Sequence, residues 1–350
     1  MKACVLNEYK KFNWMDVKKP SIHDDEVLIQ TTFASICGSD QHIFSGEFHP
    51  RTQLPLIPGH EFAGKVVEKG SAVKNIMEGD RVAVDPIIWC GKCPACQIQH
   101  YPACTSLKLL GVDLDGGFGE YVVAKPHMLY KLTDNITDQE GALVEVLGIG
   151  FHACNRAGVK PGDSVAIWGA GKVGHCILQA VKTKTDGPVY LIDLIDERLN
   201  KAKEGYPDVI TINPLRNDPV QIVREQTQGR GVDIAFEAAG HDTSGGYTIN
   251  PVRGCIQLIR GAGKVCVLGL GDDPASIRFK ELIWKEASII ASRVSHGEFA
   301  EVIQQMDRGN LKPDLLISDV FGANRVQEAF ELLNDAPEKH LKILLSFQES

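Results

Sequence analysis

A glycine-rich turn constrains the fold of this chain more than any other feature. It is a G-x-G-x-x-G sequence at residues 169–174, between the apolar run Ser164–Trp168 and a helical stretch from about Gly171 to Thr183. The next apolar run, Val189–Ile192, is followed directly by Asp193. A strand, a tight turn, a helix and a second strand that ends in an acid form the unit that binds dinucleotides. The turn therefore predicts a βαβ unit in a parallel sheet.

Five of the six residues of this turn have an expected role in binding a pyrophosphate. Gly169 allows the tight turn, Gly171 lets the backbone approach the phosphates, and Gly174 permits close packing of helix on strand. The first helical residues, Lys172 and Val173, offer free N–H groups at the positive end of the helix dipole. The alternative interpretation is a strand–turn–helix that binds nothing.

Four further residues complete the expected coenzyme site. We expect Asp193 to accept hydrogen bonds from the ribose hydroxyls and to repel a 2′-phosphate, which favours NAD over NADP. Arg198 could weaken the preference for NAD over NADP. Leu268 and Gly269, at the end of another apolar run, are expected to contact the same coenzyme.

The two parts of the chain have different patterns. Strand-like and helix-like segments alternate after the turn, at Asp196–Glu204, Val209–Ile212, Pro219–Gln226, Val232–Phe236 and Val265–Leu268. This alternation indicates a doubly wound parallel sheet and an α/β fold class. The first ~150 residues instead contain short apolar runs broken by Gly and Pro, at Val27–Thr31, Gly64–Val67, Arg81–Val84 and Tyr121–Val123. That pattern is typical of a mostly antiparallel, barrel-like β domain.

Four of the ten cysteines are crowded together. They are Cys90, Cys93, Cys96 and Cys104, and the others are scattered. Four thiolates at this spacing can surround one ion tetrahedrally, which leaves no open position and makes the site structural. A four-cysteine iron–sulfur cluster is the competing interpretation.

A second set of metal-ligand types is spread over the first 150 residues. It comprises Cys37, His60, Glu61 and Glu145. A thiolate, an imidazole and a carboxylate with one open position form a catalytic zinc site. Spacing alone does not join these residues, because each type is also common in ordinary cores.

The order of these motifs resembles that of the zinc-containing medium-chain alcohol and polyol dehydrogenases. The segment 59–64, with its Gly-His-Glu start, looks like the zinc signature of that family, and the segments 37–42, 90–104, 115–121 and 169–174 follow the order of the family. The resemblance implies a GroES-like β-barrel catalytic domain at 1–150 and 291–350, with a structural zinc lobe at 90–104. It also implies a Rossmann NAD-binding domain at 151–290, a homodimer or homotetramer, and two zinc ions per chain.

The resemblance also implies roles for individual residues. Cys37 and His60 would bind the catalytic zinc, with Asp40 behind the histidine, and Ser39 and His42 would relay the proton. Glu61 and Glu145 compete for the third protein ligand, and glutamate at 145 is similar to the sorbitol-dehydrogenase-like branch; that branch usually has proline where Val146 stands. Because Cys37 and one glutamate already neutralise a zinc ion, we expect one glutamate to bind the metal. The other would hydrogen-bond the metal-bound water.

The expected reaction is hydride transfer from a secondary alcohol to NAD. The chain looks most like the bacterial starvation-sensing-type dehydrogenases, which are associated with hexonates such as L-gulonate or L-galactonate. Arg293 is then a candidate partner for a substrate carboxylate, or else forms a salt bridge on domain closure. A polyol dehydrogenase and L-threonine 3-dehydrogenase share this metal chemistry, and a zinc-free quinone reductase or a non-catalytic binder is a remoter alternative.

Charge and composition exclude several other classes. The net charge is −8 and the isoelectric point is about 5.8, which argues against nucleic acid or an anionic membrane as a partner. The N-terminal segment has no signal-peptide h-region, so we expect the cytosol.

Overall fold

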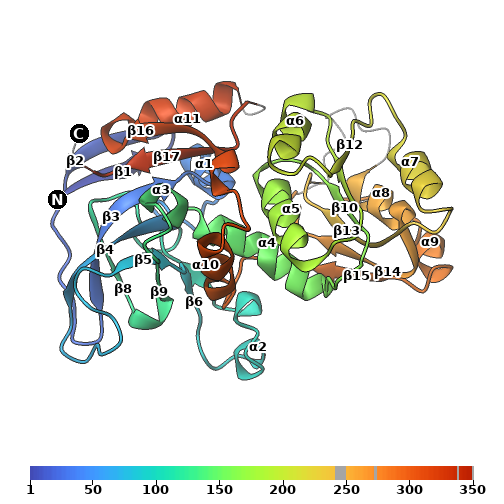
Figure 1. The fold of residues 1–350 in the computed structure, drawn as a ribbon. Helices are drawn as coiled ribbons and strands as arrows, with labels where there is room; N and C mark the ends of the chain where they lie inside the picture. Colours follow the sequence, from blue (N-terminus) through green and yellow to red (C-terminus); the bar gives the residue numbers. More distant parts are fainter. Residues whose placement is uncertain (241–249, 272–273, 337–338, 349–350) are drawn as a thin grey trace. The chain divides into compact units, whose positions relative to one another are not determined.

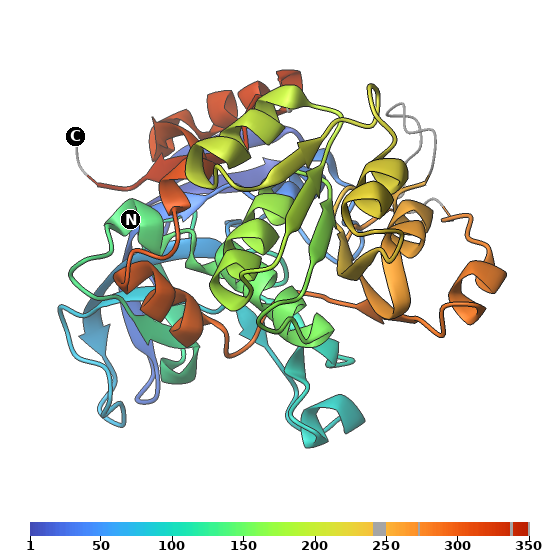
Figure 2. The same ribbon diagram turned by 45° about the vertical axis from the view of Figure 1, so that its right-hand side comes forward.

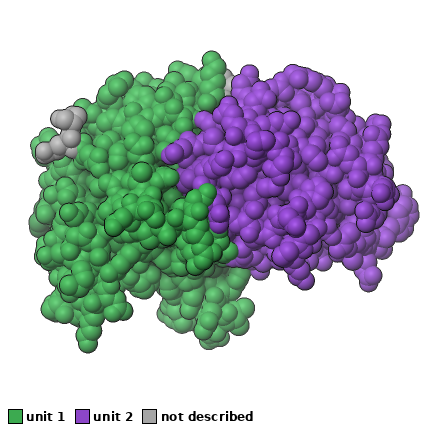
Figure 3. All heavy atoms as spheres, in the orientation of Figure 1, with its two compact units in different colours: residues 1–146, 296–309, 316–350 green, residues 147–295, 310–315 purple. Residues whose placement is uncertain are grey.

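The computed structural model describes the chain except for residues 241–249, 272–273, 337–338 and 349–350. Two compact units make up the chain (Figure 3). Unit 1 comprises residues 1–146, 296–309 and 316–350, and unit 2 comprises residues 147–295 and 310–315. The sequence boundaries at 150 and 291 lie a few residues from these, and the short piece 310–315 of unit 2 had no signal in the sequence. No helix in the described ranges is long and apolar enough to cross a membrane.

A seven-stranded sheet forms the centre of unit 1 (Figure 1). Its strands in spatial order are β16 (Ile317–Gly322), β17 (Lys342–Ser346), β3 (Val27–Ser35), β4 (Glu61–Lys69), β5 (Arg81–Val84) and β9 (Leu129–Lys131), with β8 (Tyr121–Ala124) also paired to β3. Only the pair β16–β17 is parallel. Strand β3 pairs with β8 through its first half and with β17 through its last residues. The mostly antiparallel arrangement therefore agrees with the alternation of apolar runs in this part of the sequence.

Shorter elements complete unit 1. Two small antiparallel pairs are β1 (Lys2–Glu8) with β2 (Lys11–Asp16), and β6 (Ile87–Ile88) with β7 (Lys108–Leu109). Its helices are α1 (Gly38–Ser45), α2 (Pro94–Gln97), α3 (Asp138–Gly141), α10 (Phe299–Asp307) and α11 (Val326–Asp335), with 3-10 turns at Tyr101–Ala103, Pro126–Met128, Pro313–Leu316 (shared with unit 2) and Ala323–Arg325. Helix α4 (Val144–Ala157) begins in unit 1 and continues into unit 2.

Unit 2 is built on a six-stranded parallel sheet. The spatial order is β12 (Ile210–Ile212), β11 (Val189–Ile192), β10 (Val165–Trp168), β13 (Val232–Glu237), β14 (Ile259–Val267) and β15 (Ser288–Ala291). Helices α5 (Lys172–Lys184) and α6 (Asp196–Gly205) lie on one face, and α7 (Pro219–Gln226), α8 (Pro251–Leu258) and α9 (Phe279–Ile283) lie on the other (Figures 1 and 2). The chain order reverses direction at β10, which is where such sheets bind ligands.

The strand that the sequence placed at Val265–Leu268 starts earlier in the structure. Strand β14 extends back to Ile259, through a glycine-rich stretch in which Ala262 has a φ of 55°. The pairing with β13 shifts register between Val232 and Ile234. This irregular, exposed part of the strand has no apolar alternation, so the sequence pattern could not reveal it.

Candidate metal centres and dinucleotide-binding turn

The four crowded cysteines converge on one point in a lobe of unit 1. One sulfur from each of Cys90, Cys93, Cys96 and Cys104 lies within 4.8 Å of the others. Helix α2 begins after Cys93 and carries Cys96. Backbone N–H groups point at the sulfurs: those of Cys90 and Ser106 donate to Cys104 Sγ, and that of Cys93 donates to Cys90 Sγ, each at 3.4 Å.

Hydrogen bonds and burial shift the pKa values of two cysteines in this lobe. The backbone N–H of Cys96, and then that of Thr105, lower the pKa of Cys93 to about 6. Burial has the opposite effect on Cys96 and raises its pKa to about 12. Four sulfurs this close cannot all ionise without a cation among them. The donor set, all thiolate and with no open position, fits a structural zinc ion.

The second candidate centre is assembled from three elements of unit 1. Cys37 lies between the end of β3 and the start of α1, and His60 directly precedes β4. Glu61 is the first residue of β4 and pairs across the sheet with Ser35 of β3. The structure brings ligand atoms of Cys37, His60 and Glu61 within 4.8 Å of one another.

Two polar side chains of α1 flank His60. Its Nδ1 lies 3.3 Å from Asp40 Oδ1, and its Nε2 lies 3.2 Å from Ser39 Oγ. Asp40 is itself fixed, because its other oxygen accepts a hydrogen bond of 2.8 Å from the backbone N–H of Cys37. Burial alone would lower the pKa of His60, but the charges of Asp40 and Cys37 raise it well above its usual value. Asp40 therefore lies where it can orient the imidazole.

His42 lies at the solvent-facing side of the same helix. Its Nδ1 is hydrogen-bonded to Glu47 Oε2 at 2.5 Å, and its ring stacks on Phe48 with centroids 6.0 Å apart. More than half of its side chain is exposed. An exposed imidazole with a carboxylate partner can exchange protons with water, so the predicted relay role of His42 stays a prediction that this geometry allows.

A lysine that the sequence argument did not use lies against this centre. Lys342, the first residue of β17, bonds both carboxylate oxygens of Glu61 at 2.5 Å. Both side chains have 0% exposure. Burial alone would raise the pKa of Glu61, but the Lys342 charge, followed by that of His60, lowers it. The signal was present in the sequence as the one charged residue within the apolar run Leu341–Phe347.

Glu145 stands in the first turn of α4 with its carboxyl group buried. Glu145 is only 4% exposed, and its Oε2 has no hydrogen-bond partner among the described residues. Burial, and then the charge of Glu61, raises the pKa of Glu145 well above its usual value. Its oxygens are not within the 4.8 Å group of Cys37, His60 and Glu61. An orphaned buried oxygen beside a thiol, an imidazole and a second carboxylate fits a divalent cation such as zinc.

Opposing charges act on the thiol of Cys37. Burial and the Glu61 charge would each raise its pKa, whereas the charges of Lys342 and His60 lower it, and the net effect is a lowered pKa. The cluster therefore favours the thiolate, which is the form that binds metal.

In unit 2, the glycines at 169–174 have the geometry that a dinucleotide turn needs. Gly169 has a φ of 106°, and a Cβ on Gly174 would lie 1.8 Å from the carbonyl oxygen of Gly169. A Cβ on Gly171 would meet nothing closer than 3.9 Å, the guanidinium of Arg198. Gly171 also caps α5, whose first residues are Lys172 and Val173. Free space at the N-terminus of a helix fits the phosphates of a dinucleotide.

Asp193 follows β11 and is held rigidly by backbone donors. The N–H of Ala170 donates to its Oδ2 at 2.6 Å, and the N–H of Ile195 donates to its Oδ1 at 2.9 Å. The bond to Ala170 ties this carboxylate to the glycine turn.

The expected contacts Leu268 and Gly269 follow β14, beside a buried acid that the sequence argument missed. The Leu268 N–H donates to the Glu237 carbonyl at 2.9 Å, and the Gly269 N–H donates to Glu237 Oε2 at 3.2 Å. The N–H groups of Ala239 and Gly240 bind the other carboxylate oxygen at 2.9 and 2.8 Å. Glu237 thus organises two strand ends at the same edge of the sheet as Asp193.

Arg293, the candidate substrate residue, lies just after β15 in unit 2. It is exposed, and its guanidinium has no ion-pair partner within the described ranges. The structure does not bring it into either metal cluster.

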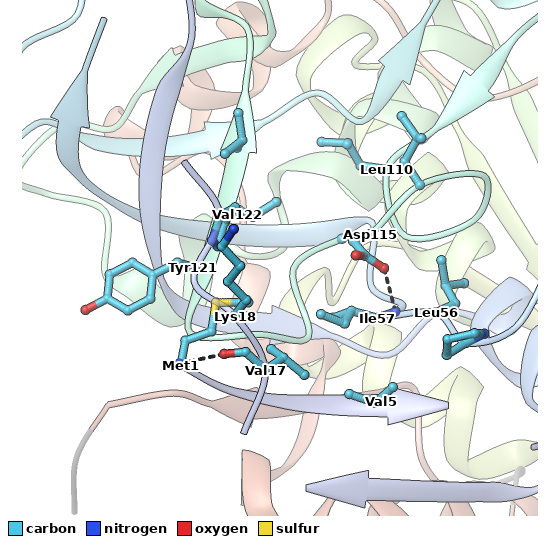
Figure 4. A pocket seen from close by; sticks show the side chains of 15 residues that line it. Met1, Val5, Val17, Lys18, Leu56, Ile57, Leu110, Asp115, Tyr121 and Val122 are labelled. Carbon is cyan, nitrogen blue, oxygen red and sulfur yellow. Dashed lines mark hydrogen bonds between the residues drawn. The ribbon is translucent and has the colours of Figure 1, made fainter. Parts of the chain in front are cut away.

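A separate cavity of about 410 Å³ lies in unit 1 (Figure 4). Its wall is mostly apolar, with Leu56, Ile57 and Leu110 among its residues and with Asp115 and Lys18 at the side. Asp115 accepts a hydrogen bond of 2.9 Å from the Ile57 N–H (Figure 4). None of the candidate metal ligands lines this cavity, so it is separate from the second centre.

Two family models match the chain. Residues 23–134 match the family described as "Alcohol dehydrogenase GroES-like domain", and residues 173–308 match "Zinc-binding dehydrogenase". The L-threonine 3-dehydrogenase of Pyrococcus furiosus is 36% identical over 325 residues, 91% of this chain and 90% of its own. The L-idonate 5-dehydrogenase of Vitis vinifera is 31% identical over 320 residues, 89% of this chain and 86% of its own.

A solved structure is similar over nearly the whole chain. The crystal structure of the alcohol dehydrogenase rspB of Escherichia coli CFT073 with NADH has a TM-score of 0.90 and 30% identity, and covers 99% of each chain. The comparisons confirm the α/β fold class expected from the sequence, with a GroES-like and a Rossmann-type domain.

Proposed function

The chain belongs to the zinc-containing medium-chain alcohol and polyol dehydrogenases, and on that premise we propose that it oxidises a secondary hydroxyl of a sugar acid with NAD. The observation that carries the proposal is the buried cluster of Cys37, His60 and Glu61 beside the unpartnered carboxyl of Glu145. A zinc-free quinone reductase or a binding protein has no use for such a cluster. The four-cysteine lobe, by contrast, would only stabilise the fold.

The two cofactors define the chemistry. Bound zinc supplies a Lewis acid that polarises the substrate oxygen, and NAD supplies the hydride acceptor. Cys37 and His60 would hold the metal, and Asp40 would fix the orientation of the imidazole from 3.3 Å away. Glu145 would take either the third ligand position or a hydrogen bond to the oxygen that approaches the metal.

The chain's own side chains would also move the proton. Ser39 lies 3.2 Å from His60 Nε2, beside the nitrogen expected to bind the metal. A serine hydroxyl cannot act as a base at its ordinary pKa, so its role is hand-over. His42, exposed and paired with Glu47, would release the proton to water.

The turn at 169–174 would bind the pyrophosphate of the coenzyme. The open space in front of Gly171 and the N-terminus of α5 support this assignment. Asp193, fixed by the Ala170 N–H, supports NAD over NADP, because a carboxylate at that place repels a 2′-phosphate.

The sugar-acid substrate rests on two observations. A relative at 31% identity is an L-idonate 5-dehydrogenase, and Arg293 offers an exposed guanidinium with no protein partner among the described residues. Guanidinium can bind a carboxylate through two parallel hydrogen bonds, which lysine cannot reproduce. Threonine is the second candidate, favoured by the 36% identity to an L-threonine 3-dehydrogenase.

The test is a screen of hexonates, neutral polyols and L-threonine with NAD, followed by NADH absorbance. We expect a hexonate such as L-gulonate or L-galactonate to give the highest kcat/KM. Arg293→Lys should then reduce activity on the hexonate about tenfold or more while changing that on the matching polyol much less. Arg278→Lys, an exposed arginine of the same unit, is the control. A preference for a polyol or for threonine would contradict the sugar-acid assignment.

We further propose that two copies associate through β15. This strand is the outer member of its sheet, and Ile289 on it is 42% exposed. Next to it in sequence, Phe279, Ile283 and Trp284 are 68–77% exposed. An open strand edge flanked by large apolar side chains suits a second copy that pairs across a two-fold axis.

Sedimentation velocity tests this association. We expect the wild type to sediment as a dimer or tetramer and Trp284→Glu to dissociate it. Leu215→Glu, a similarly exposed site of the same unit, should leave the assembly unchanged. A monomeric wild type would contradict the proposal.

A further inference from the structure

The ion pair between Lys342 and Glu61 is the most deeply buried pair of opposite charges in the described part of unit 1. Neither side chain is exposed, and the ammonium reaches both carboxylate oxygens at 2.5 Å. Lys342 Nζ also donates to the backbone carbonyl of Ile36, the residue before Cys37, at 3.4 Å. Burying such a pair is costly, and hydrophobic residues of similar volume often stabilise a core as well. Stability alone therefore does not explain why charges occupy this position.

Counting the charges around the centre gives a reason. Cys37, Glu61 and Glu145 contribute three negative charges when ionised, and buried Asp40, 3.3 Å from His60, contributes a fourth. His60 is neutral when it binds a metal. A zinc ion alone would leave two negative charges in excess, and the Lys342 ammonium reduces that excess to one. Removing charge from a buried centre matters, because interactions between charges are strong where water is excluded.

We propose that Lys342 is the positioning residue that compensates the charge of Glu61. It reduces the excess negative charge around the metal site, and through its contacts with both oxygens of Glu61 it restrains this carboxylate from becoming a permanent metal ligand. This inference rests on the proposed zinc-dependent function. It also adds to the expectation from the sequence, which considered the charges of Cys37 and the glutamates but not that of Lys342.

Removing Lys342 should have a different effect if the residue compensates charge than if it only stabilises the fold. Without the ammonium, the cation loses a repulsive neighbour and Glu61 is free to bind it. Lys342→Met should therefore hold the metal more tightly while the enzyme becomes slower. A residue that only stabilises the fold would, when removed, weaken both metal binding and turnover together.

Four variants separate these outcomes: Lys342→Met, Lys342→Arg, Glu61→Gln and the double variant Glu61→Gln/Lys342→Met. Zinc loss to a chromophoric chelator and the d–d absorption of the cobalt form report on the centre, and the unchanged four-cysteine lobe gives a constant background. We expect Lys342→Met to lose zinc from this centre at least tenfold more slowly, with weaker cobalt absorption as coordination increases. Lys342→Arg should behave as the wild type.

The two variants with Glu61→Gln test the same idea by removing the negative charge of the pair. Glu61→Gln alone also keeps the proposal testable if Lys342→Met does not fold. Glu61→Gln leaves the ammonium uncompensated, so zinc affinity should fall at least tenfold. The double variant restores the net charge of the wild-type centre and should regain at least tenfold over Glu61→Gln. If the double variant binds zinc as weakly as Glu61→Gln, or if Lys342→Met binds it more weakly than the wild type, the proposal is overturned.

These outcomes are independent of the substrate. If the metal affinities change as expected but no hexonate, polyol or threonine is oxidised, the proposed function fails and the role of Lys342 stands. If a hexonate is oxidised but the affinities do not change, the role of Lys342 fails and the function stands.

Discussion

The two candidate metal centres of unit 1 differ in how the chain builds them. The four-cysteine lobe takes all its ligands from residues 90–104, and its sulfurs accept hydrogen bonds from neighbouring backbone N–H groups. The second centre draws Cys37 from one segment and the adjacent His60 and Glu61 from another, with Glu145 and Lys342 brought from far along the chain. A local centre depends on the lobe alone, whereas a dispersed centre depends on the whole fold of the unit.

The centres also differ in electrostatics. In the lobe, backbone dipoles favour thiolate at Cys93, and four thiolates close the coordination sphere. In the second centre, opposite charges are buried side by side, and Glu145 has an oxygen with no partner in the described residues. A closed set of ligands suits stability and an open, charged one suits catalysis, so damage to the two centres should have opposite effects.

The largest effect is expected from Glu145→Gln. The change removes a positioned carboxylate and keeps its shape, so turnover should fall about 100-fold, as for loss of an acid–base group. Thermal stability should not fall, because burial already raises the pKa of Glu145 and makes its charge costly. Steady-state kinetics and thermal unfolding of the same preparation measure both.

Glu78→Gln is the matched control, an exposed glutamate of the same unit. Wild-type turnover in Glu145→Gln would show that Glu145 is not part of the catalytic centre. It would also contradict the proposed difference between the two centres.

Cys93→Ser should show the reverse behaviour. Losing one of four thiolates weakens the metal that holds the lobe, and the unfolding temperature should fall on the order of 10 °C. Protein that remains folded should retain near-normal turnover per zinc ion at the second centre. A variant that is fully stable and still carries two zinc ions would show that the lobe does not bind a structural metal.

Asp193→Ala, in unit 2, should affect neither metal centre and so serves as a reference. Loss of its carboxylate should raise the KM for NAD about tenfold, since a charge-assisted contact contributes about 1.5–3 kcal/mol. The difference between the KM values for NAD and NADP should therefore become smaller. Zinc content should be unchanged. An unaltered ratio of NAD to NADP use would exclude Asp193 from coenzyme selection.

The contrast between the centres also explains what the sequence could predict. The four cysteines are close in sequence, so their spacing alone indicated a site. The glycine turn was equally local, and its expected helix and strands appear as β10, α5 and β11 with ends shifted by a residue or less. Cys37, His60 and Glu145 could be joined only through resemblance to a family, because no local pattern links residues that far apart.

Residues whose role depends on tertiary contacts were missed. Lys342 lies nearly 300 residues from Glu61 in sequence, and only the pairing of β17 with β3, and of β3 with β4, brings the two together. Glu237 was overlooked because a buried acid at a strand end has no signature other than its position. For Lys342 the signal was a charge within an apolar segment, which predicts a buried partner without identifying it.

A chelator titration of the wild-type enzyme, with zinc content, activity and thermal unfolding followed together, tests the division between the two centres most directly. We expect two zinc ions per chain. Activity should disappear with the first ion while the unfolding temperature changes little, and it should return when zinc is added back. The second ion should leave only as the protein loses stability. Loss of activity and stability together with the same ion, or a chain that holds a single zinc ion, would contradict the division between a catalytic and a structural centre.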